Sequence, residues 1–229
     1  MHRRLLVLVG CSLFAACGCG GSGSGGSAPS GPSGQVRMFN DFVDVSKVTG
    51  KVGTTQFIKA QPFATISLYR LVPVGSPTAT FTNSDTSAQL ASSSITVEDQ
   101  KQYTVIGVGS SGVGRHVMFL TDGTTVPSGQ AAIRFLNGDE DAPSVDIYLT
   151  STSTTSLTGV VPQESAVAYL ATGTTYHTFA PGTYTVWYTA AGHPETVIVE
   201  NNVTLTAGEE ETLFAVKSGS GPIIQEIPE

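Results

Sequence analysis

The chain has 229 residues and a net charge of −7; 40% of its residues are hydrophobic and only 13% are charged. This hydrophobic content suffices for one large or two ordinary cores, which excludes a chain that is disordered throughout. Thr, Ser, Gly and Val dominate the composition, which predicts an all-β protein. Beyond the N-terminus Lys and Arg form no cluster, so we expect no nucleic acid partner.

The first 34 residues have the composition of an export signal followed by a tether. Arg3 and Arg4 form a basic start, and the apolar run from Leu5 to Ala16 is too short to cross a bilayer as a stable helix. Residues 1–16 are therefore expected to be a signal peptide. Apart from two cysteines, residues 17–34 are all Gly, Ser, Ala or Pro, which is typical of a solvated linker.

All three cysteines lie in or beside this signal, so the exported part has no disulfide and no cysteine metal site. An apolar run that ends in small residues and a cysteine resembles the signal of bacterial lipoproteins, whose cysteine is lipidated and becomes the new N-terminus. We expect lipidation at Cys17, because the apolar run before Cys11 is short. Lipidation at Cys19 or Cys11 and an ordinary cleaved signal peptide are the alternatives.

The residue after Cys17 bears on the localisation that this resemblance implies. Gly18 follows the cysteine, where Asp would favour retention at the inner membrane. The resemblance therefore implies a protein of the bacterial cell envelope that is lipid-anchored in the outer membrane. Its folded part would lie on the periplasmic face or at the cell surface.

Beyond the tether, three pairs of similar stretches recur in the same order, which predicts an internal repeat. "QVRMFND" and "AIRFLNGDED" share a core that places Arg37 opposite Arg134. "GTTQFIKAQPFATISLYRL" pairs with "GTTYHTFAPGTYTVWYTA", which places Ser67 opposite Trp187. "YTVIGVGSS" pairs with "ETLFAVKSG". Loop-sized insertions separate these anchors, and loops tolerate such changes.

The spacing of short alternating segments predicts the fold of each copy. Segments such as "VDIYL", "AVAYL", "TYTVWYT", "TVIVE", "VTLTA" and "TLFAV" are bounded by Gly, Pro, Asn and Asp. Such spacing is typical of an antiparallel β-sandwich. We predict two tandem Ig-like or Greek-key sandwiches, residues 35–122 and 130–229, joined by a linker at 123–129.

Three glycines, Gly107, Gly109 and Gly112, have the G-x-G-x-x-G spacing of a dinucleotide-binding loop. Such a loop needs a helix after the third glycine and an acidic residue about 20 residues further on. A strand-like run follows here instead, and the second copy has Ala215 and Lys217 where the first has Gly107 and Gly109. We therefore predict a β-hairpin and no cofactor.

The second copy contains an apolar-Arg-Phe-apolar-Asn start, an Ala-Pro-x-Val-Asp segment, a Gly-Thr-Tyr-Thr-Val strand and a Leu-Thr-Ala-Gly turn. With these motifs it resembles the DUF4397 family of bacterial exported β-sandwich domains. The first copy has "DFVDVSKVTGK" in place of the Ala-Pro segment, so its membership rests on the internal repeat and on the tandem occurrence of such domains in the family. The resemblance implies the fold and leaves the function undefined. The matching residues are Arg134, Phe135, Asn137, Ala142, Pro143, Val145, Asp146, 182–186 and 205–208.

Acidic residues gather at Asp139, Glu140 and Asp141, with Asp146 close behind. Ca²⁺ binds several oxygens that converge from a turn, but the spacing here is not that of an EF-hand. Asn137 and Asp139 can instead cap an exposed turn through side chain to backbone hydrogen bonds. We predict no metal site and regard Asp139, Asp141 and Asp146 as weak candidates only.

The sequence contains no G-x-S-x-G, H-E-x-x-H, C-x-x-C or Walker motif. His177 and His193 could approach each other across a hairpin, but two isolated histidines do not predict a zinc site. We predict a non-catalytic envelope module, tethered to the membrane, that binds a glycan or an envelope protein or has a structural role. The alternative is a hydrolase of a cell-envelope or extracellular polymer, with carboxylates from residues 139–146 or 209–211.

Trp187 is the only tryptophan and the one candidate for a ligand platform. In "TYTVWYT" the alternation of strand side chains puts Tyr184, Val186 and Tyr188 on the core face and Trp187 among threonines on the other. Three placements stay open: half-buried under a loop or the other domain, exposed as a stacking surface, or turned into the core by a bulge. The repeat assigns the same core role to Ala64, Ile66 and Leu68.

Overall fold

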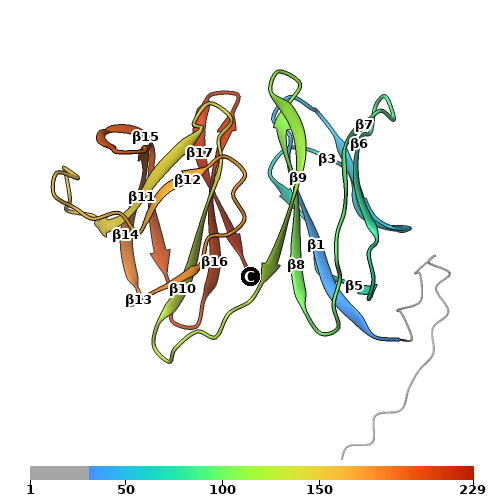
Figure 1. Ribbon diagram of the computed structural model, residues 1–229, viewed down its shortest axis with the longest axis horizontal. Coiled ribbons are helices and arrows are strands. Elements are labelled where there is room, and N and C mark those ends of the chain that lie inside the picture. Colours follow the sequence, from blue (N-terminus) through green and yellow to red (C-terminus); the bar gives the residue numbers. More distant parts are fainter. Residues whose placement is uncertain (1–30) are drawn as a thin grey trace, which may run out of the picture.

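The computed structural model describes residues 31–229, and all regular structure in this part of the chain is β-strand. Figure 1 shows four sheets stacked in layers, two in each half of the molecule. The two middle sheets, one from each half, face each other and are called the junction sheets. The other two are called the outer sheets. The predicted signal peptide and all but residues 31–34 of the predicted tether lie outside the described residues.

In the first half, the junction sheet has the strand order β4-β1-β8-β9, with β5 also paired to β1. The outer sheet has the order β3-β2-β6-β7. The strands are β1 (Ser33–Asp41), β2 (Val48–Val52), β3 (Thr55–Gln61), β4 (Thr65–Ile66), β5 (Arg70–Pro73), β6 (Thr78–Asn83), β7 (Gln89–Ser94), β8 (Gln102–Ser110) and β9 (Gly114–Asp122).

In the second half, the junction sheet has the order β13-β10-β16-β17 and the outer sheet the order β12-β11-β14-β15. The segments "TVIVE" and "VTLTA", expected as separate strands, both belong to the long strand β15. The strands are β10 (Ala131–Gly138), β11 (Ser144–Ser151), β12 (Glu164–Ala168), β13 (Tyr176–Phe179), β14 (Gly182–Ala190), β15 (His193–Leu205), β16 (Glu210–Ser218) and β17 (Gly221–Pro228).

The all-β sandwich fold predicted from the sequence is confirmed, with one addition in each junction sheet. β1 runs parallel to β8, with Arg37 opposite Thr104, and β10 runs parallel to β16, with Arg134 opposite Thr212. The other pairs of these strands are antiparallel. Alternation of apolar and polar residues looks the same in both arrangements, so the sequence did not reveal the parallel pairs.

Each half has its own apolar core between its junction sheet and its outer sheet. Val36 and Met38 of β1 and Phe81 of β6 are fully buried in the first core. Phe135 of β10 and Tyr188 of β14 are fully buried in the second. Successive side chains of a strand point to opposite faces, so the intervening residues of β1 and β10 face the other half of the molecule.

A third cluster of buried apolar side chains lies between the two junction sheets. It contains Phe39, Ile106 and Leu120 from the first half and Leu136 and Phe214 from the second. Each of these five side chains is at most 3% exposed. The two halves therefore share a packed apolar interface, which we call the junction (Figure 1).

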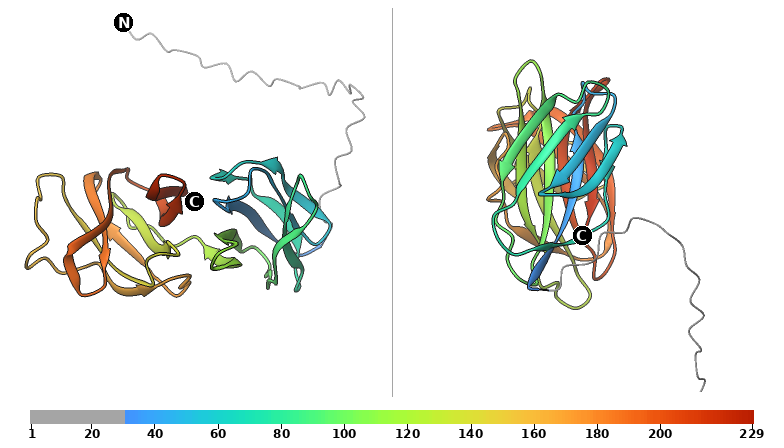
Figure 2. Two further views of the ribbon diagram at one scale, coloured as in Figure 1. Left: turned by 90° about the horizontal axis from the view of Figure 1, so that it is seen from above. Right: turned by 90° about the vertical axis from the view of Figure 1, so that its right-hand side faces the viewer.

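Residues 123–130 connect β9 to β10. The N–H of Gly123 donates to Glu229 (3.2 Å) and the N–H of Thr124 donates to Glu210 (3.1 Å), so the connection begins against the second half. Figure 1 and the left view of Figure 2 place the C-terminus between the two halves. The ends of β9 and of the whole chain thus meet at the junction.

The hairpin predicted for the three glycines is confirmed, because β8 and β9 are antiparallel from Gln102 opposite Asp122 to Ser110 opposite Gly114. Gly107 faces the first core, where an added Cβ would lie 2.5 Å from the Phe42 ring. The glycine is therefore required for close packing rather than for binding a phosphate.

One pairing in the predicted repeat is wrong. The segment around Ser67 forms β4 and β5, which pair with β1, whereas the strand of Trp187 pairs with β11 and β15. Ser67 is therefore not the counterpart of Trp187. Ile66 and Leu68, expected in the core, are 38% and 86% exposed. The two stretches share a pattern of residues, but long-range packing decided which strand each one joined.

Candidate functional site

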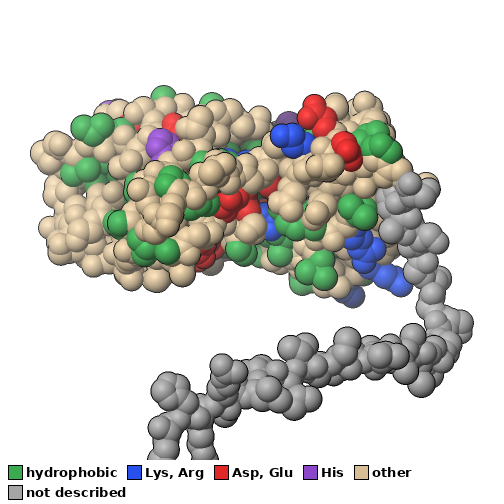
Figure 3. All heavy atoms as spheres, turned by 90° about the horizontal axis from the view of Figure 1, so that it is seen from below, with side chains coloured by type: hydrophobic (Ala, Val, Ile, Leu, Met, Phe, Trp, Pro, Cys, Tyr) green, Lys and Arg blue, Asp and Glu red, His purple; other side chains and the backbone are tan. Residues whose placement is uncertain are grey.

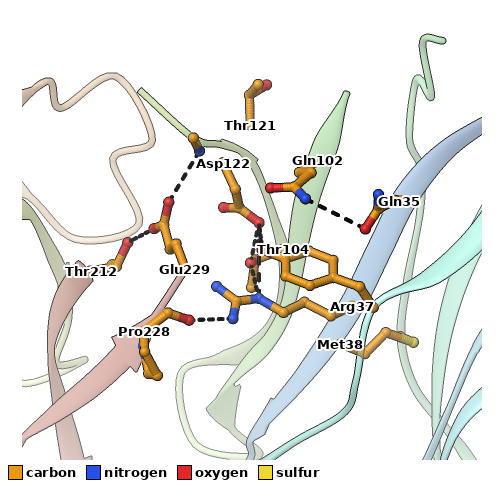
Figure 4. A network of polar contacts seen from close by, with 12 residues as sticks. Gln35, Arg37, Met38, Gln102, Thr104, Thr121, Asp122, Thr212, Pro228 and Glu229 are labelled. Carbon is orange, nitrogen blue, oxygen red and sulfur yellow. Dashed lines mark hydrogen bonds and ion pairs between the residues drawn. The ribbon is translucent and has the colours of Figure 1, made fainter. Parts of the chain in front are cut away.

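Polar side chains from both halves meet at the junction, and Figure 4 shows several of them. Nε of Arg37 donates to Thr104 Oγ1 (2.8 Å), and Thr104 Oγ1 donates in turn to Asp122 Oδ2 (2.5 Å). The Tyr69 hydroxyl donates to the same carboxylate oxygen (2.9 Å). The Arg37 guanidinium also lies over the Tyr69 ring, 4.6 Å from its centroid, which adds a cation–π contact.

The second half contains the same set of four contacts. Nε of Arg134 donates to Thr212 Oγ1 (3.0 Å), and Thr212 donates to the Glu229 carboxylate. The Tyr176 hydroxyl donates to the same carboxylate, and the guanidinium lies 4.9 Å from the Tyr176 ring centroid. An arginine, a threonine, a tyrosine and an acid thus make the same contacts in each half, with the arginines on β1 and β10 and the threonines on β8 and β16. We call these eight residues the junction network.

The two sets are joined through their arginines. Nη2 of Arg134 lies 3.1 Å from Asp122 Oδ1 and 2.7 Å from Glu229 Oε1, so one guanidinium pairs with an acid of each half. Nε of Arg37 lies 3.9 Å from Asp122 Oδ2. Both arginine side chains are at most 6% exposed and both carboxylates are fully buried. Two positive and two negative groups are therefore buried together.

Burial controls the electrostatics of this network. Burial raises the pKa of Asp122, and the nearby Glu229 charge raises it further, while the hydrogen bond from Thr104 and the charges of the two arginines lower it. Burying a charge without a partner costs several kcal/mol of folding free energy. The two arginines offset this cost by pairing with the buried carboxylates. The arrangement positions two sandwiches against each other and leaves both acids fully hydrogen-bonded.

Sequence reasoning found Arg37 and Arg134 as equivalent positions but missed their partners. Asp122 lies at the end of β9, and Glu229 follows β17. Neither acid belongs to the stretches that carry the repeat, and they meet only because the two junction sheets face each other. The one available signal was the pairing of "YTVIGVGSS" with "ETLFAVKSG", which places Thr104 opposite Thr212.

The weak metal candidates engage other groups. Asp139 Oδ1 accepts from the Asp141 N–H (3.1 Å), the Asp141 carboxylate lies 2.8 Å from the Lys217 ammonium, and Asp146 accepts two backbone N–H bonds of 2.8 Å each. Within residues 31–229, no group of three or more His, Cys, Asp or Glu side chains could hold a metal ion. Asp139 caps a turn and Asp146 anchors two loops, as Asp side chains commonly do, whereas Asp141 forms an ion pair.

The histidines and the remaining candidate acids lie apart from the junction network. His177 Nε2 is 2.8 Å from Glu164, and His193 Nδ1 is 3.0 Å from Glu195, so these two histidines have different acidic partners. Glu211 is 5% exposed. Burial raises its pKa to about 7, and the charges of Glu226, Glu209 and Glu229 act in the same direction.

Trp187 is half-buried on the solvent-facing side of the second outer sheet. Its indole Nε1 donates to Thr150 Oγ1 of the neighbouring strand β11 (2.9 Å), so the ring extends across the sheet toward that strand. Thr150 and Thr185 are each 8% exposed although they lie on this outer face. Val186 and Tyr188 occupy the opposite face and belong to the second core, as the alternation predicted.

The surroundings of the indole are polar. Tyr148 lies directly across the strand pair from Trp187, and Glu200 lies opposite on β15. The Thr185 hydroxyl donates to the Asn202 side-chain oxygen (2.8 Å). Glu200 and Asn202 are exposed. An aromatic surface bordered by amide, hydroxyl and carboxylate groups can stack on a ring while its neighbours form hydrogen bonds.

Cys17, the expected lipidation site, lies outside the described residues, as do Cys11 and Cys19. Along residues 31–229, no helix is long and apolar enough to cross a membrane.

The model of the family called domain of unknown function DUF4397 matches residues 34–148, and the chain belongs to this family. The match covers the first half, whose membership was expected to rest on the repeat and on tandem occurrence in the family, and it ends within β11. It includes the motif from Arg134 to Asp146. The expected motifs at 182–186 and 205–208 lie beyond it. No curated protein matches the chain.

Two solved structures show weak similarity. The Bacillus anthracis TIE protein has 10% identity and a TM-score of 0.27, with coverage of 82% of this chain and 34% of that one. This chain thus spans about a third of the TIE protein. The family CBM26 module CBMbc of Eubacterium rectale Amy13K, solved in complex with maltoheptaose, has 10% identity and a TM-score of 0.28, with coverage of 84% and 96%. Neither similarity carries an argument about function.

Proposed function

We propose that this protein is a non-catalytic, lipid-anchored module of the bacterial cell envelope that binds a glycan on the outer sheet of its second half. The observation that carries the proposal is the position of Trp187. Its N–H already has a partner in Thr150, so the indole can offer its remaining exposed surface to a ligand without losing a hydrogen bond. Asn202 and Glu200 stand beside it as donors and acceptors for sugar hydroxyls.

The two halves are proposed to be tandem DUF4397 repeats. The repeated arginine, threonine, tyrosine and acid support this, because they make the same set of contacts in each half. The parallel first strand in each junction sheet supports it as well. In this proposal the junction network fixes the orientation of the second half, and with it the Trp187 surface, relative to the anchored first half.

The anchor is proposed to be a lipid on Cys17, followed by the Gly, Ser and Pro tether and attached to the outer membrane. The test is mass spectrometry of the protein from membranes, alongside the C17S variant. Wild-type protein should sediment with membranes and carry acyl chains that are absent from C17S. Acyl chains that persist in C17S and map to Cys19 or Cys11 would move the site, and soluble, unlipidated wild-type protein would reject the anchor.

Glycan binding can be tested with neutral oligosaccharides. We would titrate the purified protein with malto-, cello-, xylo- and chitohexaose and follow Trp187 fluorescence and calorimetric heat. At least one sugar should bind the wild type, W187A should lose most of that affinity, and W187F should retain part of it through its aromatic ring. Equal binding by W187A would contradict the proposed site.

The hydrolase alternative is tested in the same titrations. A hydrolase would release reducing ends from the oligosaccharides, and its most suitable acid is Glu211, whose pKa is raised to about 7. We expect no release by the wild type. Release that disappears in E211Q would favour the hydrolase over a binding module.

A further inference from the structure

The outer sheet of the first half has a groove on its solvent-facing side. Its volume is about 450 Å³, within the range of small-ligand sites. The lining contains hydroxyl groups, one amide and one ammonium group, and no aromatic side chain. The lining residues are Thr49, Lys51, Gly53, Thr80, Thr82, Asn83, Ser84 and Ser87.

The floor of this groove corresponds to the place that Trp187 occupies in the second half. β2 and β6 are neighbours in the first outer sheet, as β11 and β14 are in the second. On their outer faces, β2 and β6 place Thr49 opposite Thr82 and Lys51 opposite Thr80. β11 and β14 place the large Tyr148 opposite Trp187. The first half thus has three threonines and a lysine at this place, where the second half has two aromatic side chains.

The walls of the groove are held by hydrogen bonds within the protein. Asn83 Oδ1 accepts from the N–H groups of Asp85 (2.9 Å) and Thr86 (3.2 Å), which fixes the turn between β6 and β7. Thr49 Oγ1 and Ser84 Oγ are 2.8 Å apart, so this turn is tied to the floor. A site whose walls are already ordered loses little conformational entropy when a ligand binds.

Lys51 is the one charged residue in the lining, and it is exposed. In the part of the chain that the structure describes, no carboxylate lies within ion-pair distance of its ammonium group. An ammonium group that faces an open groove favours a negatively charged ligand.

The distribution of charge over the chain agrees with this. Residues 33–122 contain seven Lys and Arg residues and six Asp and Glu residues, which gives a net charge of +1. Residues 131–229 contain two Lys and Arg residues and twelve Asp and Glu residues, which gives a net charge of −10. On the face drawn in Figure 3, the blue side chains outside the junction lie over the first half. An anion is therefore repelled by the second half and tolerated by the first.

We propose that this groove is a second saccharide site and that it binds an acidic sugar. The carboxylate of the sugar would pair with Lys51, and its hydroxyls would form hydrogen bonds with Thr80, Thr82 and Asn83. The proposal rests on the proposed function only in that both concern saccharides, because the groove and the Trp187 surface lie on different sheets.

The test uses the purified protein with trigalacturonate, a carboxylated trisaccharide, and its fully methyl-esterified form. Trigalacturonate should bind by calorimetry and shift the backbone amide resonances of Thr49, Lys51 and Thr80. K51A should weaken binding about tenfold, which is typical of a lost charge-assisted hydrogen bond. The matched control is K59A, an exposed lysine of β3 outside the lining, which should leave the affinity unchanged.

The outcomes separate this proposal from the one on Trp187. Equal affinity for the methyl ester, or equal losses in K51A and K59A, would overturn the groove as an acidic-sugar site. Trigalacturonate binding that survives W187A supports it. Binding that is lost in W187A and kept in K51A would reject the groove while retaining the Trp187 surface. If the protein binds neutral sugars but not trigalacturonate, the groove is likewise rejected and the Trp187 surface is retained.

Discussion

Arg37 and Arg134 each donate from Nη1 to a main-chain carbonyl of the opposite half, Arg37 to Pro228 and Arg134 to Thr121. Each acceptor directly precedes the acid of its own half. The contacts are therefore reciprocal, as in a two-fold interface between identical subunits, although both partners belong to one chain. A change to either arginine removes contacts in both halves at once, which makes the junction testable by single substitutions.

The R134A variant should lose about 3–5 kcal/mol of unfolding free energy, because Asp122 and Glu229 would remain buried without their shared partner. The control is R115A. Arg115 pairs with Asp44 at 2.6 Å, but the two side chains are 22% and 29% exposed, so its loss should cost less than about 1 kcal/mol. Urea unfolding followed by circular dichroism measures both, and similar losses would contradict the role of the network.

The stability should depend on pH through Glu211. Its pKa is raised to about 7 in the folded protein, so the folded state binds more protons than the unfolded state between about 4.5 and 7. The unfolding free energy should therefore fall as the pH rises through this window, by about 3 kcal/mol in total. E211Q should flatten this part of the profile. A profile that keeps its slope in E211Q would assign the effect to other acids such as Asp122, whose pKa is also raised.

The glycines of the hairpin should respond to substitution according to their packing. A Cβ at Gly107 would lie 2.5 Å from the Phe42 ring and 3.0 Å from Phe81, so G107A should cost about 1–3 kcal/mol. At Gly112 the nearest atom is the Ser110 hydroxyl at 3.8 Å, so G112A should have little effect. Thermal unfolding of the two variants measures this difference. Similar losses of stability in G107A and G112A would contradict the packing explanation.

Local patterns in the sequence predicted which residues of a strand share a face. They did not predict which sheet each strand joins. The alternation in "TYTVWYT" correctly placed Val186 and Tyr188 in the core and Trp187 outside it. The same alternation failed for Ile66 and Leu68, because their segment joins the edge of the junction sheet instead of crossing the outer sheet. Periodicity shows which residues share a face, and only tertiary packing decides what that face meets.

The candidate sites illustrate the same limit. Trp187 could be singled out because it is one large residue in a row of threonines. Asp122 and Glu229 lie 107 positions apart and meet through the packing of two halves, so no local pattern connected them. The groove beside Lys51 is lined mainly by threonine and serine side chains of two neighbouring strands and a turn. Such residues are common in this sequence, so none of them stood out as a candidate.

Millimolar Ca²⁺ should leave the melting temperature nearly unchanged, because Asp146 and Asp139 already accept backbone hydrogen bonds. D146A should instead destabilise the protein by about 1–3 kcal/mol with or without Ca²⁺, since it leaves two backbone N–H groups without an acceptor. D141A is the control, as Asp141 is an exposed partner of Lys217. A Ca²⁺-dependent rise of several degrees that is lost in D139A with D141A would reveal a metal site.

The last prediction concerns the second half as an isolated fragment, residues 129–229. Its core lies between its own two sheets, so the fragment should unfold cooperatively. Its junction sheet, however, would expose Leu136, Phe214 and Val216, which are fully buried in the whole chain. Because the junction contacts are reciprocal, this face can pair with a second copy of itself, with Arg134 of each copy near the acid of the other. The fragment should therefore dimerise.

Light scattering after size exclusion, with thermal melts of the same samples, tests this. L136K places a charge at the centre of the exposed face and should give a monomer that still unfolds cooperatively. V197K is the matched control, because Val197 is an exposed residue of β15 on the outer sheet, and this variant should stay dimeric. A wild-type fragment that is monomeric at high concentration would show that the junction pairs only within one chain. A fragment without cooperative unfolding would show that the two halves form a single folding unit.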